Sequence, residues 1–222
     1  MRPESAEPGV TERLTSRPTF TTSPSTQFNK VLLDEIRAAT AEDHAALEAD
    51  LPLMNDDLTL DTYRSVVERF LGFVDPFEKK LWSVNALESS GILKDTRQKT
   101  HLLERDLDAL GHTRESINRI PRATELPRID DLANALGAMY VIEGSTLGGQ
   151  VIGRHLKTAL GIDETSGSAY FTGYGRLTSK RWKEYLTSLS SLENHIDGRR
   201  AVEAARSTFS LMRSWLCTEH IT

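Results

Sequence analysis

Apolar residues recur at steps of three and four positions along most of the chain from residue 29 onward, which is the spacing of one helix face. In the first such stretch the face consists of Leu33, Ile36, Thr40, His44, Leu47 and Leu51. Pro52 ends this helix, because proline has no backbone N–H to donate. Thr59 begins the next helical segment, which Pro76 is expected to kink or break. The predicted helices cover 59–74, 77–89, 93–110, 129–160, about 178–196 and about 199–217.

Segments rich in helix-breaking residues separate these helices. Residues 119–129 form a proline-bounded connection, and residues 161–175 form a loop rich in glycine, serine, threonine and aromatic residues. Continuous alternation of apolar and polar residues, which is typical of strands, is hard to find. The pattern predicts an all-α bundle of about six to eight helices, forming a single domain over residues 29–222.

Residues 1–28 have a different composition. They contain four of the eight prolines and ten serine or threonine residues, without helical or strand periodicity. Such a segment cannot bury enough apolar surface to offset the entropy that is lost on ordering. We therefore predict a flexible N-terminal tail over residues 1–28, with a docking segment as the functional alternative.

Composition and charge narrow the class of protein. Apolar residues make up 38% of the 222 residues, enough for a core without disulfide support, and the single cysteine, Cys217, excludes a multi-cysteine zinc site. The formal net charge of −5 disfavours a general nucleic-acid-binding surface. The chain has no apolar run of membrane-spanning length and no secretory signal pattern at its start. We therefore expect a cytoplasmic protein with no membrane span and no nucleic-acid partner.

His44 stands out because it lies on the apolar face of the first predicted helix. Glu48 follows four residues later, so the two side chains are neighbours on the same face. A carboxylate there can accept a hydrogen bond from one ring nitrogen and leave the other free for a metal. The alternative interpretation is a core histidine that is satisfied by a neighbouring group.

A second unusual feature is the sequence GSTLGGQVIG at 144–153. Its four glycines interrupt an apolar helical segment, at a cost of about 4 kcal/mol relative to alanine. Gly144 and Gly148 lie one turn apart on the same face, so they leave bare backbone for a flat group to approach. Close helix–helix packing is the alternative interpretation. The spacing matches neither common phosphate-binding glycine motif.

Together these features favour a planar ligand held between two helices. A histidine from one helix would bind the metal, and glycines of another would cover the opposite face. Heme has this geometry, and histidine is a common ligand of its iron.

RAATAEDHAALE (37–48) together with GAMYVIEGSTLGGQVI (137–152) resembles the heme oxygenase family, and most closely its bacterial, biliverdin-producing branch associated with bacterial phytochromes. The likeness covers roughly residues 30–217. It implies the heme-oxygenase-like helical fold, with heme between the first helix and a kinked distal helix. It also implies that His44 is the proximal iron ligand, with Glu48 as its hydrogen-bond partner, and that Gly144, Gly148 and Gly149 are the distal glycines.

The resemblance also implies residues that contact heme b at its edge. Arg37 and Tyr140 match positions near the heme propionates, and Thr40 lies one turn before the proximal histidine. Arg181 and Lys183, within GYGRLTSKRWKEYL (173–186), are candidates for further propionate contacts.

The implied reaction uses heme as both cofactor and substrate. It cleaves heme with O2 and reductant to biliverdin, by default the IX-alpha isomer, together with CO and Fe²⁺. An external ferredoxin or flavoprotein reductase would supply electrons, and a bacteriophytochrome could receive the biliverdin. Ser145 stands where the mammalian type has an aspartate that orders distal water. The water network is therefore expected to use backbone groups, Ser145 or Thr146.

Alternatives of other classes remain. A heme sensor or carrier would bind heme through His44 without degrading it. A thiamine-degrading enzyme of the same helical superfamily needs a cysteine nucleophile, and Cys217 lies five residues from the end of the chain. A ferritin-like protein needs paired Glu-x-x-His motifs, which this sequence lacks.

Overall fold

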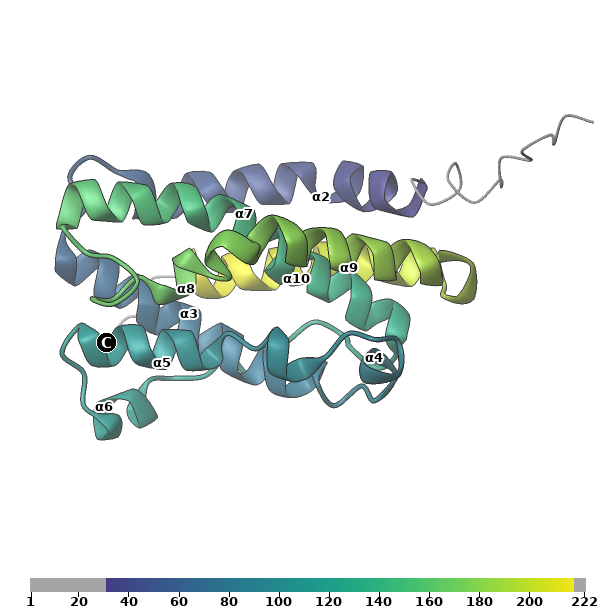
Figure 1. Cartoon of the computed structure of the whole chain (residues 1–222), viewed down its shortest axis with the longest axis horizontal. Helices are drawn as coiled ribbons and strands as arrows, with labels where there is room; N and C mark the ends of the chain where they lie inside the picture. The colour runs from purple at the N-terminus through teal and green to yellow at the C-terminus, as the bar shows by residue number, and fades with distance from the viewer. Residues whose placement is uncertain (1–30, 218–222) are drawn as a thin grey trace, which may run out of the picture.

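The structure is a computed structural model that describes residues 31–217, and this part of the chain forms a bundle of helices without strands (Figure 1). The long helices are α2 (Val31–Asp50), α3 (Leu60–Leu81), α5 (Thr100–Ala109), α7 (Leu132–Leu160), α9 (Thr178–Leu192) and α10 (Gly198–Cys217). The short ones are α4 (Ala86–Ser89), α6 (Arg114–Arg119) and α8 (Ala169–Thr172), with 3-10 turns η1 (Pro52–Met54), η2 (Lys94–Thr96), η3 (Gly175–Leu177) and η4 (Glu193–His195). The all-α prediction is confirmed.

Two predictions fall partly or wholly beyond this range. The tail over residues 1–28 lies outside the described residues, as do both ends of the predicted domain. Within the described range, no helix has the length and apolar character needed to cross a membrane.

Helix α7 crosses the bundle and connects its parts. Figure 1 shows α7 starting near α4 and ending at the opposite end of the bundle beside α2. Its first half packs against α10, and the buried Tyr185 of α9 donates a hydrogen bond to the Leu136 carbonyl at 2.8 Å. Helices α3 and α5 pack together on the side of the bundle away from α2. The second half of α7 therefore faces α2 across a space that the other helices border.

Several helix ends follow local sequence signals. Thr59 caps α3, and its side chain accepts a hydrogen bond from the backbone N–H of Thr62 at 3.2 Å. Asp131 caps α7 in the same way through Asn134 at 2.9 Å. Gly161 ends α7 with φ of 72°, a left-handed conformation that glycine adopts without strain.

Pro76 was expected to kink or break the helix, and the break is wrong because α3 continues through it. Proline removes the N–H that would bond the carbonyl four residues earlier, which belongs to Gly72. That carbonyl instead accepts the backbone N–H of Ala123 at 2.9 Å. The missing side chain of Gly72 makes this approach possible, since a Cβ there would lie 2.7 Å from the Pro121 oxygen. The connection over residues 119–129 thus replaces the hydrogen bond that Pro76 cannot make.

The helix predicted over 93–110 begins late, at Thr100. Glu78 of α3 reaches the start of α5, and its carboxylate accepts the backbone N–H groups of Lys99 at 2.7 Å and Thr100 at 3.1 Å. The residues before Thr100 leave the helical path, so the side chains of Arg97 and Lys99 turn into the interior.

The helix predicted over 77–89 is divided in the structure, because α3 ends at Leu81 and α4 begins only at Ala86. Helices α6 and α8 were not predicted.

Candidate functional site

A cavity of about 520 Å³ lies between α2 and the second half of α7, where the sequence placed the ligand. Its walls are mostly apolar or aromatic and come from helices far apart in the sequence: Leu47, Phe70, Ile152, Phe171, Phe209 and Met212. Of the eleven predicted site residues, nine line this cavity: Arg37, Thr40, His44, Glu48, Tyr140, Gly144, Ser145, Gly148 and Gly149. A cavity of this size and lining is suited to a mostly apolar small molecule.

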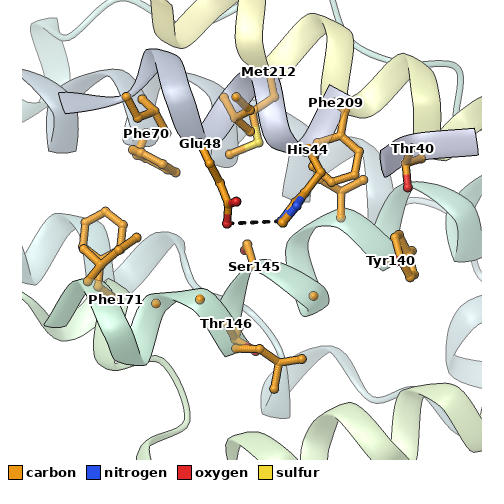
Figure 2. Close-up of a pocket in the computed structure, with 18 of the residues that line it drawn as sticks. Thr40, His44, Glu48, Phe70, Tyr140, Ser145, Thr146, Phe171, Phe209 and Met212 are labelled. Carbon is orange, nitrogen blue, oxygen red and sulfur yellow. Dashed lines mark ion pairs between the residues drawn. The ribbon is translucent and has the colours of Figure 1, made fainter. Parts of the chain in front are cut away.

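His44 and Glu48 project from α2 toward α7 (Figure 2). His44 Nε2 lies 3.5 Å from Glu48 Oε1, which is longer than a normal hydrogen bond. The His44 ring packs edge-on against Phe209 with the ring centroids 5.5 Å apart, and its side chain is 52% exposed. The predicted pairing is therefore present as a long contact. Because Nε2 is the nitrogen that faces Glu48, binding a metal through Nε2 requires His44 to leave this contact.

The glycines of the sequence at 144–153 are of two kinds. A Cβ on Gly144 would lie 3.7 Å from Trp182, and one on Gly148 would lie 4.0 Å from Glu48 Oε1, so a methyl group at either position would make only an ordinary contact. A Cβ on Gly149 would lie 2.5 Å from the backbone oxygen of Phe171 in α8, which is too close for any side chain. The interpretation as close helix packing is therefore confirmed at Gly149, while a ligand role for Gly144 and Gly148 stays a prediction. Gly144 and Gly148 leave bare backbone toward α2, while Gly149 permits close packing.

The hydroxyl groups beside these glycines already donate to the backbone. Ser145 Oγ donates to the Ile142 carbonyl at 3.0 Å, and Thr146 Oγ1 donates to the Glu143 carbonyl at 2.6 Å. Figure 2 shows Ser145 projecting toward the His44–Glu48 pair. In this arrangement both hydroxyls can accept hydrogen bonds from a ligand, but neither has a free proton to donate.

Arg37, Thr40 and Tyr140 line another part of the cavity. Burial raises the pKa of the Tyr140 phenol, and the nearby Arg37 guanidinium opposes this rise. The Thr40 hydroxyl donates to the Ile36 carbonyl at 2.8 Å, and Arg37 lies 3.6 Å from the Asp34 carboxylate. Arg37 thus supplies a half-exposed cation at the cavity, as the resemblance implied for a carboxylate-bearing ligand.

Arg181 and Lys183 do not line this cavity, so the structure does not bring them to the other predicted residues. They lie in a separate groove, where Arg181 Nη1 is 3.1 Å from Glu184 Oε2. The inner face of α9 is instead formed by Trp182 and Tyr185, and Trp182 lines the cavity. The second cation that does line the cavity is Lys99.

A buried polar cluster lies directly behind Gly144, and the sequence analysis did not predict it. Glu143 is 1% exposed and accepts hydrogen bonds from Arg97 at 2.5 Å, Lys99 at 2.6 Å and the Tyr174 hydroxyl at 2.7 Å. The Glu143 charge raises the pKa of the buried Lys99 ammonium despite desolvation. A lone acid within the apolar run GAMYVIEG is the signal that could have revealed this cluster.

Comparisons with known proteins agree with this geometry. A family model described as heme oxygenase matches residues 30–218. A heme oxygenase of Xanthomonas campestris pv. campestris is 28% identical over 165 residues, covering 72% of this chain and 91% of its own length. In structure, the chain is similar to heme oxygenase from Leptospira interrogans, with a TM-score of 0.68, 19% identity and coverage of 84% of this chain and 98% of that chain. It is also similar to the NO- and CO-bound heme oxygenase of Neisseria meningitidis, with a TM-score of 0.67, 15% identity and coverage of 86% and 94%.

Proposed function

The chain belongs to the heme oxygenase family, enzymes that degrade heme, and we propose that it cleaves heme with O2 and external electrons to biliverdin, CO and Fe²⁺. The observation that carries this proposal is the pairing of His44 with the bare backbone of Gly144 and Gly148 across one cavity. A half-exposed imidazole faces glycines that leave room for a flat group, between apolar walls. These residues fit heme b.

In this proposal His44 binds the iron, and Glu48 is its weak partner. The contact with Glu48 is made by Nε2 and is 3.5 Å long, so it is weak enough for His44 to give up when Nε2 binds the iron. Arg37 and Tyr140 contact the propionates at the heme edge, beside Thr40. The apolar walls, including Phe171, Phe209 and Met212, exclude water from the porphyrin faces.

Bound heme would supply both the iron that binds O2 and the carbon skeleton that is oxidised. The chain's own contribution is steric and polar. The backbone at Gly144 and Gly148 limits the space on the distal face, and Gly149 fixes α8 against α7. We propose that this confinement directs the reaction to one meso carbon, giving the IX-alpha isomer. A ferredoxin or flavoprotein reductase as electron donor, a bacteriophytochrome as recipient and a cytoplasmic location stay predictions.

The decisive experiment is heme titration of the wild type and of His44→Ala. We expect the variant to lose the spectrum of a histidine-ligated heme while its fold is unchanged, because the His44 side chain is half exposed. His155→Ala is a matched control, since His155 also lies on a cavity-forming helix but contacts the Asn55 carbonyl, at 3.2 Å, outside the cavity. A histidine-ligated heme in His44→Ala would contradict the assignment.

The same preparation separates an enzyme from a sensor or carrier. Wild-type protein is loaded with heme without oxygen and then given O2 and a reductase. We expect the Soret band to disappear and biliverdin absorption to rise in the red. A persistent Soret band without biliverdin would show that this chain binds heme without degrading it.

A further inference from the structure

Tyr170 carries a buried hydroxyl group for which the structure shows no partner. The residue is 6% exposed and lines the cavity, and its Oη has no hydrogen-bond partner among the described residues. Buried polar groups in native proteins nearly always have a partner, because leaving one unsatisfied costs about 1–3 kcal/mol. Because Tyr170 also lines the ligand cavity, its enclosed and unpartnered hydroxyl points to a partner that arrives with the ligand.

Packing holds Tyr170 firmly in this position. It is the second residue of α8, and its backbone N–H and that of Ala169 donate to the Asp106 carboxylate at 2.8 and 2.6 Å. Its ring packs against Phe70 and Phe171, with both ring centroids 5.3 Å away. The next residue of α8 abuts Gly149 of the distal helix. The phenol is thus fixed beside α7 without help from its own hydroxyl.

Other hydroxyl groups that line the cavity are already engaged. Thr40, Ser145 and Thr146 each donate to a carbonyl three or four residues earlier in their own helix. Tyr140 interacts with Arg37. Tyr170 is the hydroxyl whose proton is uncommitted within the described part of the cavity wall.

The cluster behind α7 adds a positive charge at the same wall. Lys99 also lines the cavity, and its ammonium donates to Glu143, to the Tyr174 hydroxyl at 2.9 Å and to the Arg97 carbonyl at 3.1 Å. The Lys99 charge acts on the Tyr170 phenol as well, and there it opposes the effect of burial. Burial, Glu78 and Glu143 together outweigh Lys99 and raise the pKa of the phenol, so Tyr170 keeps its proton and can donate it in a hydrogen bond.

We propose that Tyr170 Oη donates a hydrogen bond to the small ligand or water molecule held between bound heme and the glycine face of α7. Tyr170 would be the hydrogen-bond donor there, because the Ser145 hydroxyl already donates its proton to the Ile142 carbonyl. The inference rests on the proposed function, because it needs heme bound at His44. It assigns Tyr170 as a distal hydrogen-bond donor specific to this arrangement of α8.

Two phenols four residues apart provide a matched test. Tyr170→Phe removes a hydroxyl without a partner, whereas Tyr174→Phe removes one bonded to both Lys99 and Glu143. In thermal unfolding of the ligand-free protein, we expect Tyr170→Phe to keep or raise Tm and Tyr174→Phe to lower it. A loss of Tm in Tyr170→Phe as large as that in Tyr174→Phe would show a structural hydroxyl and overturn the inference.

The second measurement uses the CO complex of the ferrous heme-loaded protein. A donated hydrogen bond weakens the C–O bond, so Tyr170→Phe should move the C–O stretch to higher frequency in the infrared. CO should also dissociate about fivefold faster, as expected for one lost hydrogen bond. Unchanged frequency and rate in a variant that binds heme normally would overturn this inference alone. Failure of the wild type to bind heme through His44 would overturn the proposed function and this inference with it.

Discussion

Gly137 in the first half of α7 and Gly144 in the second half have opposite surroundings. In the first half, residues 132–143, most side chains are buried, and a Cβ on Gly137 would overlap the Ala201 backbone of α10. In the second half, residues 144–160, a Cβ on Gly144 would make only an ordinary contact with Trp182. Gly137 is needed for packing, whereas Gly144 lines the cavity, where we propose that it leaves space for a ligand. The role of a glycine therefore depends on the groups that face it, and the sequence does not show these.

The boundary between the halves is the buried Glu143. Its three hydrogen bonds fix α7 at the point where the cavity begins. The first half and its cluster thus provide a rigid base for the open second half. Substitutions at single residues test this difference between the two halves of α7.

The largest effect is expected from Gly137→Ala. The added methyl group would overlap the backbone of Ala201, so α7 and α10 would have to separate. We expect a loss above about 4 kcal/mol in the free energy of unfolding, which is the exceptional end of single substitutions, or failure to fold. Circular dichroism and urea unfolding measure this. A well-folded variant of near wild-type stability would show that the α7–α10 contact is loose.

Glu143→Gln should have the next largest effect. It removes the negative charge that faces the Arg97 and Lys99 side chains, which are 4% and 2% exposed. Breaking a buried ion pair in this way costs about 3–5 kcal/mol. The measurement is urea unfolding, with Glu48→Gln as the control because the Glu48 side chain is 65% exposed and has one long contact. Equal losses in both variants would contradict a special role for the cluster.

Much of the site could be predicted because its signals are local. His44 and Glu48 lie one turn apart, and Gly144 and Gly148 do so on the facing helix, so their sides of the cavity follow from helix geometry. Lys99 and Tyr170 were missed because they reach the cavity from a break before α5 and from a four-residue helix inside a predicted loop. Such placements depend on distant residues, Glu78 and Asp106 respectively, that no local pattern indicates.

The fold shows the same limit. Thr59 and Gly161 mark helix ends through their own backbone and side-chain chemistry. Pro76 was predicted to kink or break a helix, but α3 continues through it, and the Ala123 N–H supplies the missing partner of the Gly72 carbonyl from a separate segment. Arg181 and Lys183 were placed at the ligand by resemblance, whereas the face of α9 that packs inward is set by Trp182 and Tyr185.

The pH dependence of stability tests how Asp106 holds α8, the short helix that packs against the second half of α7. Burial raises the pKa of its carboxyl to about 6 from 3.8, although it accepts the first two N–H groups of α8. Because the pKa of Asp106 is higher in the folded than in the unfolded protein, its contribution to stability is fully present below the unfolded pKa. This contribution is lost as the pH rises through 6, the pKa in the folded protein. The group should therefore cost about 2 kcal/mol of stability between pH 4 and pH 7, out of about 3 kcal/mol for the whole shift.

The measurement compares urea unfolding of the wild type and Asp106→Asn across this pH range. The variant cannot titrate at this position, so its stability relative to the wild type should rise with pH, mainly between pH 4 and 6. Subtracting the two curves removes the contribution of the other carboxyl groups. Parallel curves would show that Asp106 titrates normally in the folded protein.

The smallest effect on stability is expected from Gly144→Ala, which should also weaken heme binding. Alanine is a better helix former than glycine by about 1 kcal/mol, and its methyl group would meet Trp182 at an ordinary distance of 3.7 Å. The ligand-free protein should therefore become more stable by about 1 kcal/mol, the opposite of Gly137→Ala. The same methyl group would occupy the space for the ligand's distal face, so heme affinity should fall. Urea unfolding of the ligand-free protein and heme titration measure the two effects. If the variant gains stability and still binds heme as the wild type does, the open backbone at Gly144 does not serve the ligand.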